Sequence, residues 1–232
     1  MLITLKIKRF TPGRHHRPRF RSYQVEVQPN DRLLDVLERI RAEQDPSLAY
    51  RNSCGQGLCG SDAMRVNGKN ALACKIRMST LQGQRITIEP LPGLPVIKDL
   101  VVDMQPFFDL YSSFESPLTN LEDHPGFALG ENHSHWLSQT ITMSCIHCGA
   151  CTTACPIWRS DTQYIGPAAL VMMHRYFGDG RGDNTDQRKK VLMGENGIWL
   201  CRNAYECSAC CPQEIPITRA IAEIRKKLIF KD

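Results

Sequence analysis

Apolar residues occupy every second position across residues 2–8 and again across residues 23–27. A period of two is typical of strands that bury one face, so both segments are predicted to be strands. Apolar residues then recur at helical spacing over residues 32–43, after the candidate capping residues Asn30 and Asp31. This pattern predicts a helix there.

Further short strands are predicted between residues 63 and 89. Residues 63–66 and 71–74 flank the stretch Asn67-Gly68-Lys69-Asn70, and Asn-Gly is a strong hairpin signal. Residues 85–89 alternate as a last strand. Two strands, a helix, a loop rich in cysteine and glycine, and more strands indicate a compact α+β unit.

Three prolines and one glycine between residues 90 and 95 then interrupt the pattern. We place a domain boundary near residue 96. The sequence beyond it favours helices. The first should bend at Pro106, and another should open at Gly166-Pro167. Residues 112–140 are expected to be an irregular connection. The predicted helices span residues 98–111, 166–177, 185–193 and 217–229.

The composition is that of a folded globular protein. Hydrophobic residues make up 42% and charged residues 23%, which excludes disorder of the whole chain. No apolar run approaches the length of a membrane span, and we expect neither a signal peptide nor a transit segment. Residues 1–30 hold seven Lys and Arg against one acidic residue. This basic segment is a solvated face of a two-stranded ribbon or a contact surface for an acidic partner.

Eleven cysteines fall into three tight groups separated by long gaps. In a chain without a secretion signal, such grouping favours metal ligands over disulfides. No Ser/His/Asp arrangement, P-loop or dinucleotide fingerprint accompanies them, so no residue of this chain is assigned a catalytic role.

The first group is Cys54, Cys59 and Cys74, with Asp62 at the position where the plant-type [2Fe–2S] spacing has its third cysteine. The glycines of this loop allow backbone N–H groups to face a cluster. Asp62 ligates iron as a hard ligand, or a water or Ser61 completes the site. A zinc site of three cysteines and a chance resemblance are the remaining alternatives.

The second group has the bacterial ferredoxin spacing C-x2-C-x2-C-x3-C-P and strongly favours iron–sulfur over zinc. Its members are Cys145, Cys148, Cys151 and Cys155, followed by Pro156. In ferredoxins with two clusters, the fourth cysteine of such a run ligates the other cluster. His147 is interpreted as a neighbour of the ligands rather than as one of them.

The third group repeats this frame with one ligand missing, because Ala204 stands where the first run has Cys148. If the two runs exchange their fourth cysteines, one cluster receives Cys145, Cys148, Cys151 and Cys211, enough for [4Fe–4S]. The other receives only Cys155, Cys201 and Cys207, which predicts [3Fe–4S]. Cys210 is left over, either as a buried free thiol or as a substitute ligand.

At this point the sequence resembles the iron–sulfur subunit of succinate dehydrogenase and fumarate reductase. Besides the cysteine groups, the resemblance rests on Arg51-Asn52-Ser53-Cys54, on residues 67–74, on residues 90–104 and on Tyr164-Ile165-Gly166-Pro167. It covers nearly the whole chain. Some members of this family have Asp at the position of Asp62, which favours Asp62 as a ligand.

The resemblance implies a β-grasp domain like plant ferredoxin over residues 1–96 and an all-α domain like bacterial ferredoxin over residues 97–232. It also implies an electron-transfer subunit of succinate:quinone oxidoreductase. Electrons would leave FAD on a flavoprotein subunit, pass through [2Fe–2S], [4Fe–4S] and [3Fe–4S], and reduce quinone at a hydrophobic membrane anchor. The chain would be peripheral on the cytoplasmic face of a bacterial inner membrane.

In the family, a quinone pocket lies beside the third cluster, and the matching residues here are Pro156, Ile157, Trp158 and Arg202. Trp158 replaces a tryptophan donor found elsewhere in many members, or it packs as a core residue. Arg202 stands where some members have histidine. Two other functions remain: a quinol:fumarate reductase subunit working in the opposite direction, and a zinc-stapled interaction protein.

Overall fold

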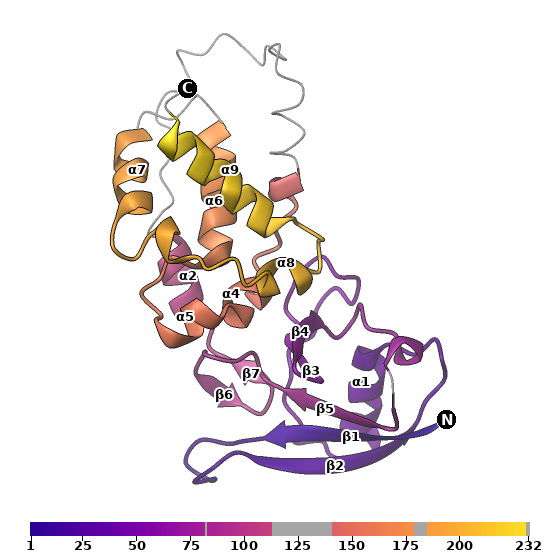
Figure 1. The fold of residues 1–232 in the computed structure, drawn as a ribbon. Coiled ribbons are helices and arrows are strands. Elements are labelled where there is room, and N and C mark those ends of the chain that lie inside the picture. Colours follow the sequence, from indigo (N-terminus) through magenta and orange to yellow (C-terminus); the bar gives the residue numbers. More distant parts are fainter. Residues whose placement is uncertain (82, 113–140, 179–184, 231–232) are drawn as a thin grey trace. The chain divides into compact units, whose positions relative to one another are not determined.

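The computed structural model describes residues 1–81, 83–112, 141–178 and 185–230 (Figure 1). They form two compact units. Unit 1 consists of residues 1–104 together with residues 146–154, and unit 2 contains the remaining described residues, on both sides of that second segment.

Unit 1 is built on a mixed five-stranded sheet in the order β2-β1-β5-β3-β4. β1 pairs in parallel with β5, and the other neighbours are antiparallel. The helix α1 (Leu33–Glu43) buries its apolar face within this unit. A sheet of this order with one crossing helix is a β-grasp arrangement. The strands are β1 (Leu2–Arg9), β2 (Arg19–Glu26), β3 (Ala63–Val66), β4 (Lys69–Leu72) and β5 (Arg85–Glu89).

The predicted strands and the first helix are confirmed, with shifts at their ends. β2 begins earlier than predicted, because its ladder with β1 continues out to the pair Arg9 and Arg19. The hairpin turn contains only Asn67 and Gly68, both with positive φ, so β4 begins at Lys69 rather than at residue 71. Two residues in this conformation form the tight turn that suits the twist of a hairpin.

The predicted cap of α1 is wrong. Arg32 holds the N-cap position, because a bridge to Arg77 keeps its backbone extended. The Arg32 backbone N–H donates to the Asp35 carboxylate at 2.9 Å. The Asp31 carboxylate instead accepts a hydrogen bond from the backbone of Gln28 at 3.0 Å.

The helix predicted over residues 98–111 is also wrong in its first half. Residues 96–98 and 101–102 form the strands β6 (Val96–Lys98) and β7 (Val101–Val102), joined through Asp99 at φ 50°. β-branched residues at these positions favour strands over helix. α2 (Gln105–Ser112) follows, and Pro106 lies in its first turn, where proline needs no hydrogen-bonding partner and causes no bend.

A buried network of charges links distant segments of unit 1. The guanidinium of Arg9 pairs with Asp45 and, at 2.9 Å, with Asp99. Asp99 also accepts hydrogen bonds from the backbones of Phe10 and Ala49, both at 3.0 Å. Burial alone would raise the pKa of Asp45, but hydrogen bonds from Ser47, Tyr23 and Arg9 hold that pKa well below its usual range.

Unit 2 is helical. α6 packs against α9, and the predicted helices over residues 166–177, 185–193 and 217–229 are confirmed. The predicted irregular connection over 112–140 lies outside the described residues, apart from Ser112. The elements after α2 in this unit are α5 (Pro156–Ser160), α6 (Gly166–Gly178), α7 (Thr185–Met193), η2 (Ile198–Leu200), α8 (Glu206–Ala209) and α9 (Ile217–Ile229).

Candidate metal centres

The first cysteine group forms a loop in unit 1 whose backbone faces a sulfur atom. The Cys54 Sγ accepts backbone N–H groups from Gln56 at 3.3 Å, Leu58 at 3.4 Å and Cys59 at 3.3 Å. Such hydrogen bonds stabilise a negatively charged thiolate and are one of the means by which proteins set the potential of a bound cluster. The loop is therefore suited to a sulfur that carries metal.

Two glycines of this loop have a backbone conformation that favours glycine, and one of them also leaves no room for a side chain. Gly55 and Gly60 both have positive φ, at 64° and 69°, which disfavours other residues. A Cβ at Gly55 would meet nothing within 4 Å, whereas one at Gly60 would lie 2.7 Å from the Cβ of Cys148. Gly60 thus brings the backbone of the first group against a cysteine of the second group.

Asp62 lies where the sequence predicts a ligand. It is 3% exposed, and its Oδ2 accepts the backbone N–H of Cys74 at 2.6 Å. Its other oxygen, Oδ1, is buried without a hydrogen-bond partner among the described residues. A buried carboxylate oxygen without a partner is costly, and coordination to a metal would satisfy it.

The thiols of this loop differ in acidity. Burial alone would raise the pKa of Cys59, but hydrogen bonds from Ser61 and Cys54 lower it to about 6. Burial raises the pKa of Cys74 to about 12, and its neighbour Asp62 contributes to that rise. Cys59 therefore favours the thiolate, which is the form that binds metal, while Cys74 needs a cation to lose its proton.

Two cysteines of the second group also belong to unit 1. Cys148 precedes the short helix α4 (Ala150–Ala154), and Cys151 lies in it. The Asn70 side-chain amide holds this helix to β4 by donating to the Ala150 carbonyl at 2.9 Å and to the Thr153 hydroxyl at 2.8 Å. Sequence reasoning used Asn70 only as part of the hairpin signal. Cys145 and Cys211 belong to unit 2, and the grouping of these four cysteines stays a prediction.

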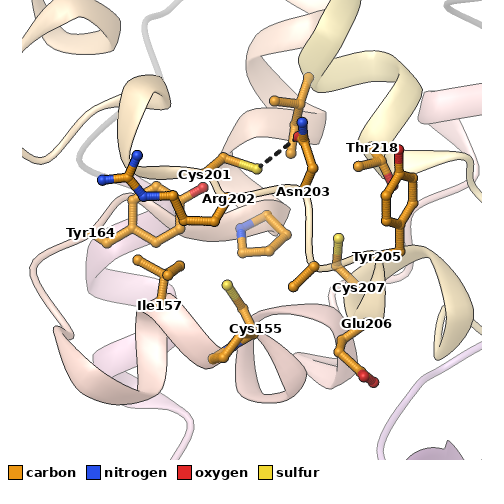
Figure 2. Close-up of a pocket in the computed structure, with 14 residues that line it drawn as sticks. Cys155, Ile157, Tyr164, Cys201, Arg202, Asn203, Tyr205, Glu206, Cys207 and Thr218 are labelled. Atoms are coloured by element: carbon orange, nitrogen blue, oxygen red, sulfur yellow. Dashed lines mark hydrogen bonds between the residues drawn. The ribbon is translucent and has the colours of Figure 1, made fainter.

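The third set of cysteines converges in unit 2. Cys155, Cys201 and Cys207 line one cavity and point into it from different sides (Figure 2). Ala204 lines the same cavity at the position that the sequence frame reserves for a fourth ligand. The described lining does not include Cys210, whose thiol donates to the Cys207 carbonyl at 3.5 Å.

Helix positions and a hydrogen bond to the backbone place the three cysteines. Cys155 is the N-cap of α5, which Pro156 opens, and Cys207 is buried in α8. The Cys201 carbonyl accepts a hydrogen bond from Arg225 of α9 at 2.7 Å, and Arg225 also donates to the Ile198 carbonyl at 2.9 Å. Nothing in the residue pattern indicated Arg225, because a cation on an amphipathic helix is usually solvated.

Burial raises the pKa of Cys207 to about 11, and the nearby Cys155 contributes to that rise. Burial likewise raises the pKa of Cys155. Thiols brought together in a buried cavity resist losing their protons unless positive charge enters with them. An iron–sulfur core supplies that charge, so the cavity fits such a group.

The candidate quinone residues lie around this cavity in different ways. Pro156, Ile157 and Arg202 line it. Trp158 is 2% exposed and is not part of the described lining. Its Nε1 is buried without a hydrogen-bond partner among the described residues. The roles of these residues stay predictions.

In the part of the chain that the structure describes, no three His, Cys, Asp or Glu side chains gather as they would around a single metal ion. None of the eleven cysteines, all of which are described, forms a disulfide bond. No helix among residues 1–81, 83–112, 141–178 and 185–230 has the length and apolar character of a membrane span.

Comparison with known proteins identifies two cluster-binding domains in this chain. The family model described as a 2Fe-2S iron-sulfur cluster binding domain matches residues 4–109, which include the first cysteine group. The model described as a 4Fe-4S dicluster domain matches residues 142–215, which include every cysteine of the other two groups. The chain therefore carries a 2Fe-2S cluster binding domain and a 4Fe-4S dicluster domain.

Relatives of known function extend over nearly the whole chain. The succinate dehydrogenase iron–sulfur subunit of Coxiella burnetii is 32% identical over 98% of this chain and 97% of its own length. The mitochondrial subunit 1 of Oryza sativa is 36% identical over 96% of this chain and 81% of its own length. A chain of the Mycobacterium smegmatis Sdh1 complex in the apo form matches with a TM-score of 0.86 and 26% identity. That match covers 98% of this chain and 95% of the other.

These matches confirm the expected α+β architecture and the resemblance from which it was inferred. The cysteine loops, the cavity and the relatives agree on one kind of molecule, an electron-transfer subunit of an oxidoreductase complex. The chain belongs to the family of succinate dehydrogenase iron–sulfur subunits.

Proposed function

We propose that this chain relays electrons between a flavoprotein subunit and quinone through three clusters. When bound, the clusters supply one-electron chemistry in a line from [2Fe–2S] through [4Fe–4S] to [3Fe–4S]. Succinate is oxidised at FAD on the partner subunit, and quinone is reduced at a membrane anchor. The residues of this chain hold the clusters, exclude water from them and set their potentials.

The cavity of unit 2 is the observation that carries this proposal. Its three thiols come from Cys155, Cys201 and Cys207, and Ala204 occupies the fourth position of the frame. Alanine has no atom that can bind iron, so the cluster at this corner lacks a protein ligand. Three thiolates without a fourth ligand would hold [3Fe–4S] rather than [4Fe–4S].

The other ligand sets follow the sequence frame. Cys54, Cys59, Asp62 and Cys74 hold [2Fe–2S], supported by the hydrogen bonds to Cys54 and by the unpartnered Oδ1 of Asp62 in the described chain. The [4Fe–4S] cluster takes the four cysteines that the sequence frame assigns to it. These ligands are Cys145, Cys148, Cys151 and Cys211.

Quinone is proposed to bind beside the third cavity. Pro156 and Arg202 line that cavity, so a quinone held by them would lie next to the last cluster. Trp158 offers a buried indole N–H, which no described residue accepts, and can donate it to a quinone oxygen. The chain is proposed to be held peripherally between the flavoprotein and the hydrophobic anchor, on the cytoplasmic face of the inner membrane.

Low-temperature EPR of the purified complex tests this proposal. The oxidised protein should show a [3Fe–4S] signal, and reduction should reveal two further signals. An oxidised sample without a [3Fe–4S] signal would contradict the proposed relay. Assays with succinate plus quinone, and with fumarate plus quinol, then determine the direction in which the complex works faster.

A further inference from the structure

Tyr164 is completely buried beside the third set of cysteines. Its exposed fraction is 0%, and it lines the cavity that contains Cys155, Cys201 and Cys207. The residue precedes Gly166-Pro167, where α6 begins, and its backbone N–H donates to the Asp161 carbonyl at 3.2 Å. The backbone at Tyr164 is therefore fixed by the turn before it and by the helix after it.

The hydroxyl of Tyr164 faces a sulfur atom. It forms a side-chain hydrogen bond with Cys201, and Figure 2 shows the ring on the Cys201 side of the cavity. A buried hydroxyl without a hydrogen-bond partner would destabilise the fold. The bond to Cys201 therefore explains how a tyrosine can be fully buried at this position.

The direction of this hydrogen bond follows from the chemistry of the sulfur. A cysteine that ligates metal has lost its proton and can only accept. The Cys201 thiol donates to the Asn203 Oδ1 at 3.6 Å, which is a hydrogen bond that a thiolate cannot make. The Tyr164 hydroxyl, by contrast, has a proton to donate in both states.

A hydrogen bond to a ligand sulfur favours the reduced cluster. Reduction adds negative charge to the cluster and its thiolates, and a donor stabilises that charge more in the reduced than in the oxidised state. The donor lies in a buried cavity, where water does not weaken the interaction.

We propose that Tyr164 is a positioning residue that raises the reduction potential of the third cluster by donating a hydrogen bond to the Cys201 sulfur. This rests on the proposed function, because it requires a cluster at Cys155, Cys201 and Cys207. The effect favours the step in which an electron from the preceding cluster reduces the third one, next to the proposed quinone site.

Potentiometric EPR titration of the whole complex tests the proposal with Tyr164→Phe, which removes only the hydroxyl. Losing one such bond should lower the equilibrium constant for reduction about tenfold, which is about 59 mV for one electron. Tyr111→Phe is the matched control. Tyr111 is also buried in unit 2, and its hydroxyl accepts from Arg175 at 3.5 Å and does not line the described cavity.

The control should leave the potential of the third cluster unchanged, and neither variant should shift the other two clusters. An unchanged third potential in Tyr164→Phe, with the [3Fe–4S] signal intact, overturns the role of Tyr164 while leaving the relay in place. Absence of that signal in the wild type overturns the relay and this role together.

A second measurement on the wild type does not depend on any variant folding. Pulsed EPR of the oxidised complex in H2O and in D2O should detect an exchangeable proton coupled to the third cluster. No exchangeable proton at that cluster would overturn the proposal. In Tyr164→Phe one exchangeable coupling should disappear, while those of the backbone N–H groups that face Cys155 and Cys207 remain, and Tyr111→Phe should keep all of them.

Discussion

The carboxylate of Asp62 accepts the backbone N–H of Cys74 at 2.6 Å through Oδ2, while Oδ1 has no hydrogen-bond partner among the described residues. One oxygen therefore fixes the loop, and the other is available to a metal. The two oxygens can be tested separately, because asparagine keeps one oxygen to accept from Cys74 but is no longer an anionic ligand.

Substitutions of Asp62 should affect iron in a defined order. Asp62→Cys should retain the [2Fe–2S] signal with a shifted potential, since thiolate is a softer ligand than carboxylate. Asp62→Ala and Asp62→Asn should both lose iron from this site, although the asparagine variant keeps the loop hydrogen bond. Iron analysis and EPR of the reduced complex measure this. Normal iron content and an unchanged potential in all three variants would reject ligation by Asp62.

Ala204→Cys should convert the third cluster. The new thiol would enter the cavity at the spacing of the missing ligand and retain a fourth iron. We expect the [3Fe–4S] signal to be replaced by [4Fe–4S], with a large fall in potential and slower quinone reduction, while succinate oxidation with an artificial acceptor continues. Cys210→Ser is the control, because Cys210 is not part of the described lining. A change of cluster type in that control would assign the ligand role to Cys210.

Gly60→Ala should disturb both neighbouring cysteine groups. The added Cβ would lie 2.7 Å from the Cβ of Cys148, so one of the two segments must move. Gly55→Ala has the same positive φ but no atom within 4 Å, so it should cost only the backbone strain of about 1–2 kcal/mol. EPR linewidths of the reduced clusters, together with thermal unfolding, measure the difference. Equal effects of the two substitutions would show that only backbone strain matters.

Arg9→Leu should destabilise unit 1 strongly. It leaves Asp99 buried without its cation and leaves Asp45 paired only with the more exposed Arg21 at 2.6 Å, and breaking a buried pair in this way typically costs about 3–5 kcal/mol. Lys8→Leu is the control, because its ion pair with Glu89 at 3.1 Å is partly exposed and should contribute less than about 1 kcal/mol. Urea unfolding monitored by circular dichroism gives both free energies. If both variants lost a similar free energy of unfolding, burial would not explain the contribution of the Arg9 ion pairs.

The same network predicts a loss of stability in acid. The pKa of Asp45 is lower in the folded chain than in the unfolded one, where it is about 3.9. Its stabilising contribution is therefore complete above that value and is lost as the pH falls through the folded pKa. In urea unfolding at pH 5 and pH 3, wild type should lose more free energy than Asp45→Asn. The same loss in both proteins would exclude Asp45 as a source of acid sensitivity.

Much of the fold could be predicted because its signals are local. The alternation in β1 and the apolar stripe of α9 depend on residues close together in sequence, and both elements lie where they were expected. The errors arose where a distant partner decided the outcome. Arg32 became the cap of α1 because Arg77 pairs with it, and Asp99 turns the chain while bonded to the backbones of Phe10 and Ala49.

The candidate sites divide in the same way. Spacing alone pointed to the cysteines of the third set, and the structure brings Cys155, Cys201 and Cys207 to one cavity. Spacing could not indicate Arg225, which reaches the Cys201 carbonyl from a helix far along the chain, or the contact between Gly60 and Cys148. Contacts of this kind depend on how distant segments pack together, and the residue types near each position do not reveal that packing.

The helix that Asn70 holds lies in a segment that joins unit 1 only after the chain has passed through part of unit 2. During synthesis, residues 1–104 therefore leave the ribosome before residues 146–154 exist to complete the unit. Until then the amide of Asn70 and the surface beneath α4 stay open to solvent and to other chains. Incomplete folding units of this kind are prone to aggregate, so the nascent protein should depend on chaperones during the interval before residue 154 emerges.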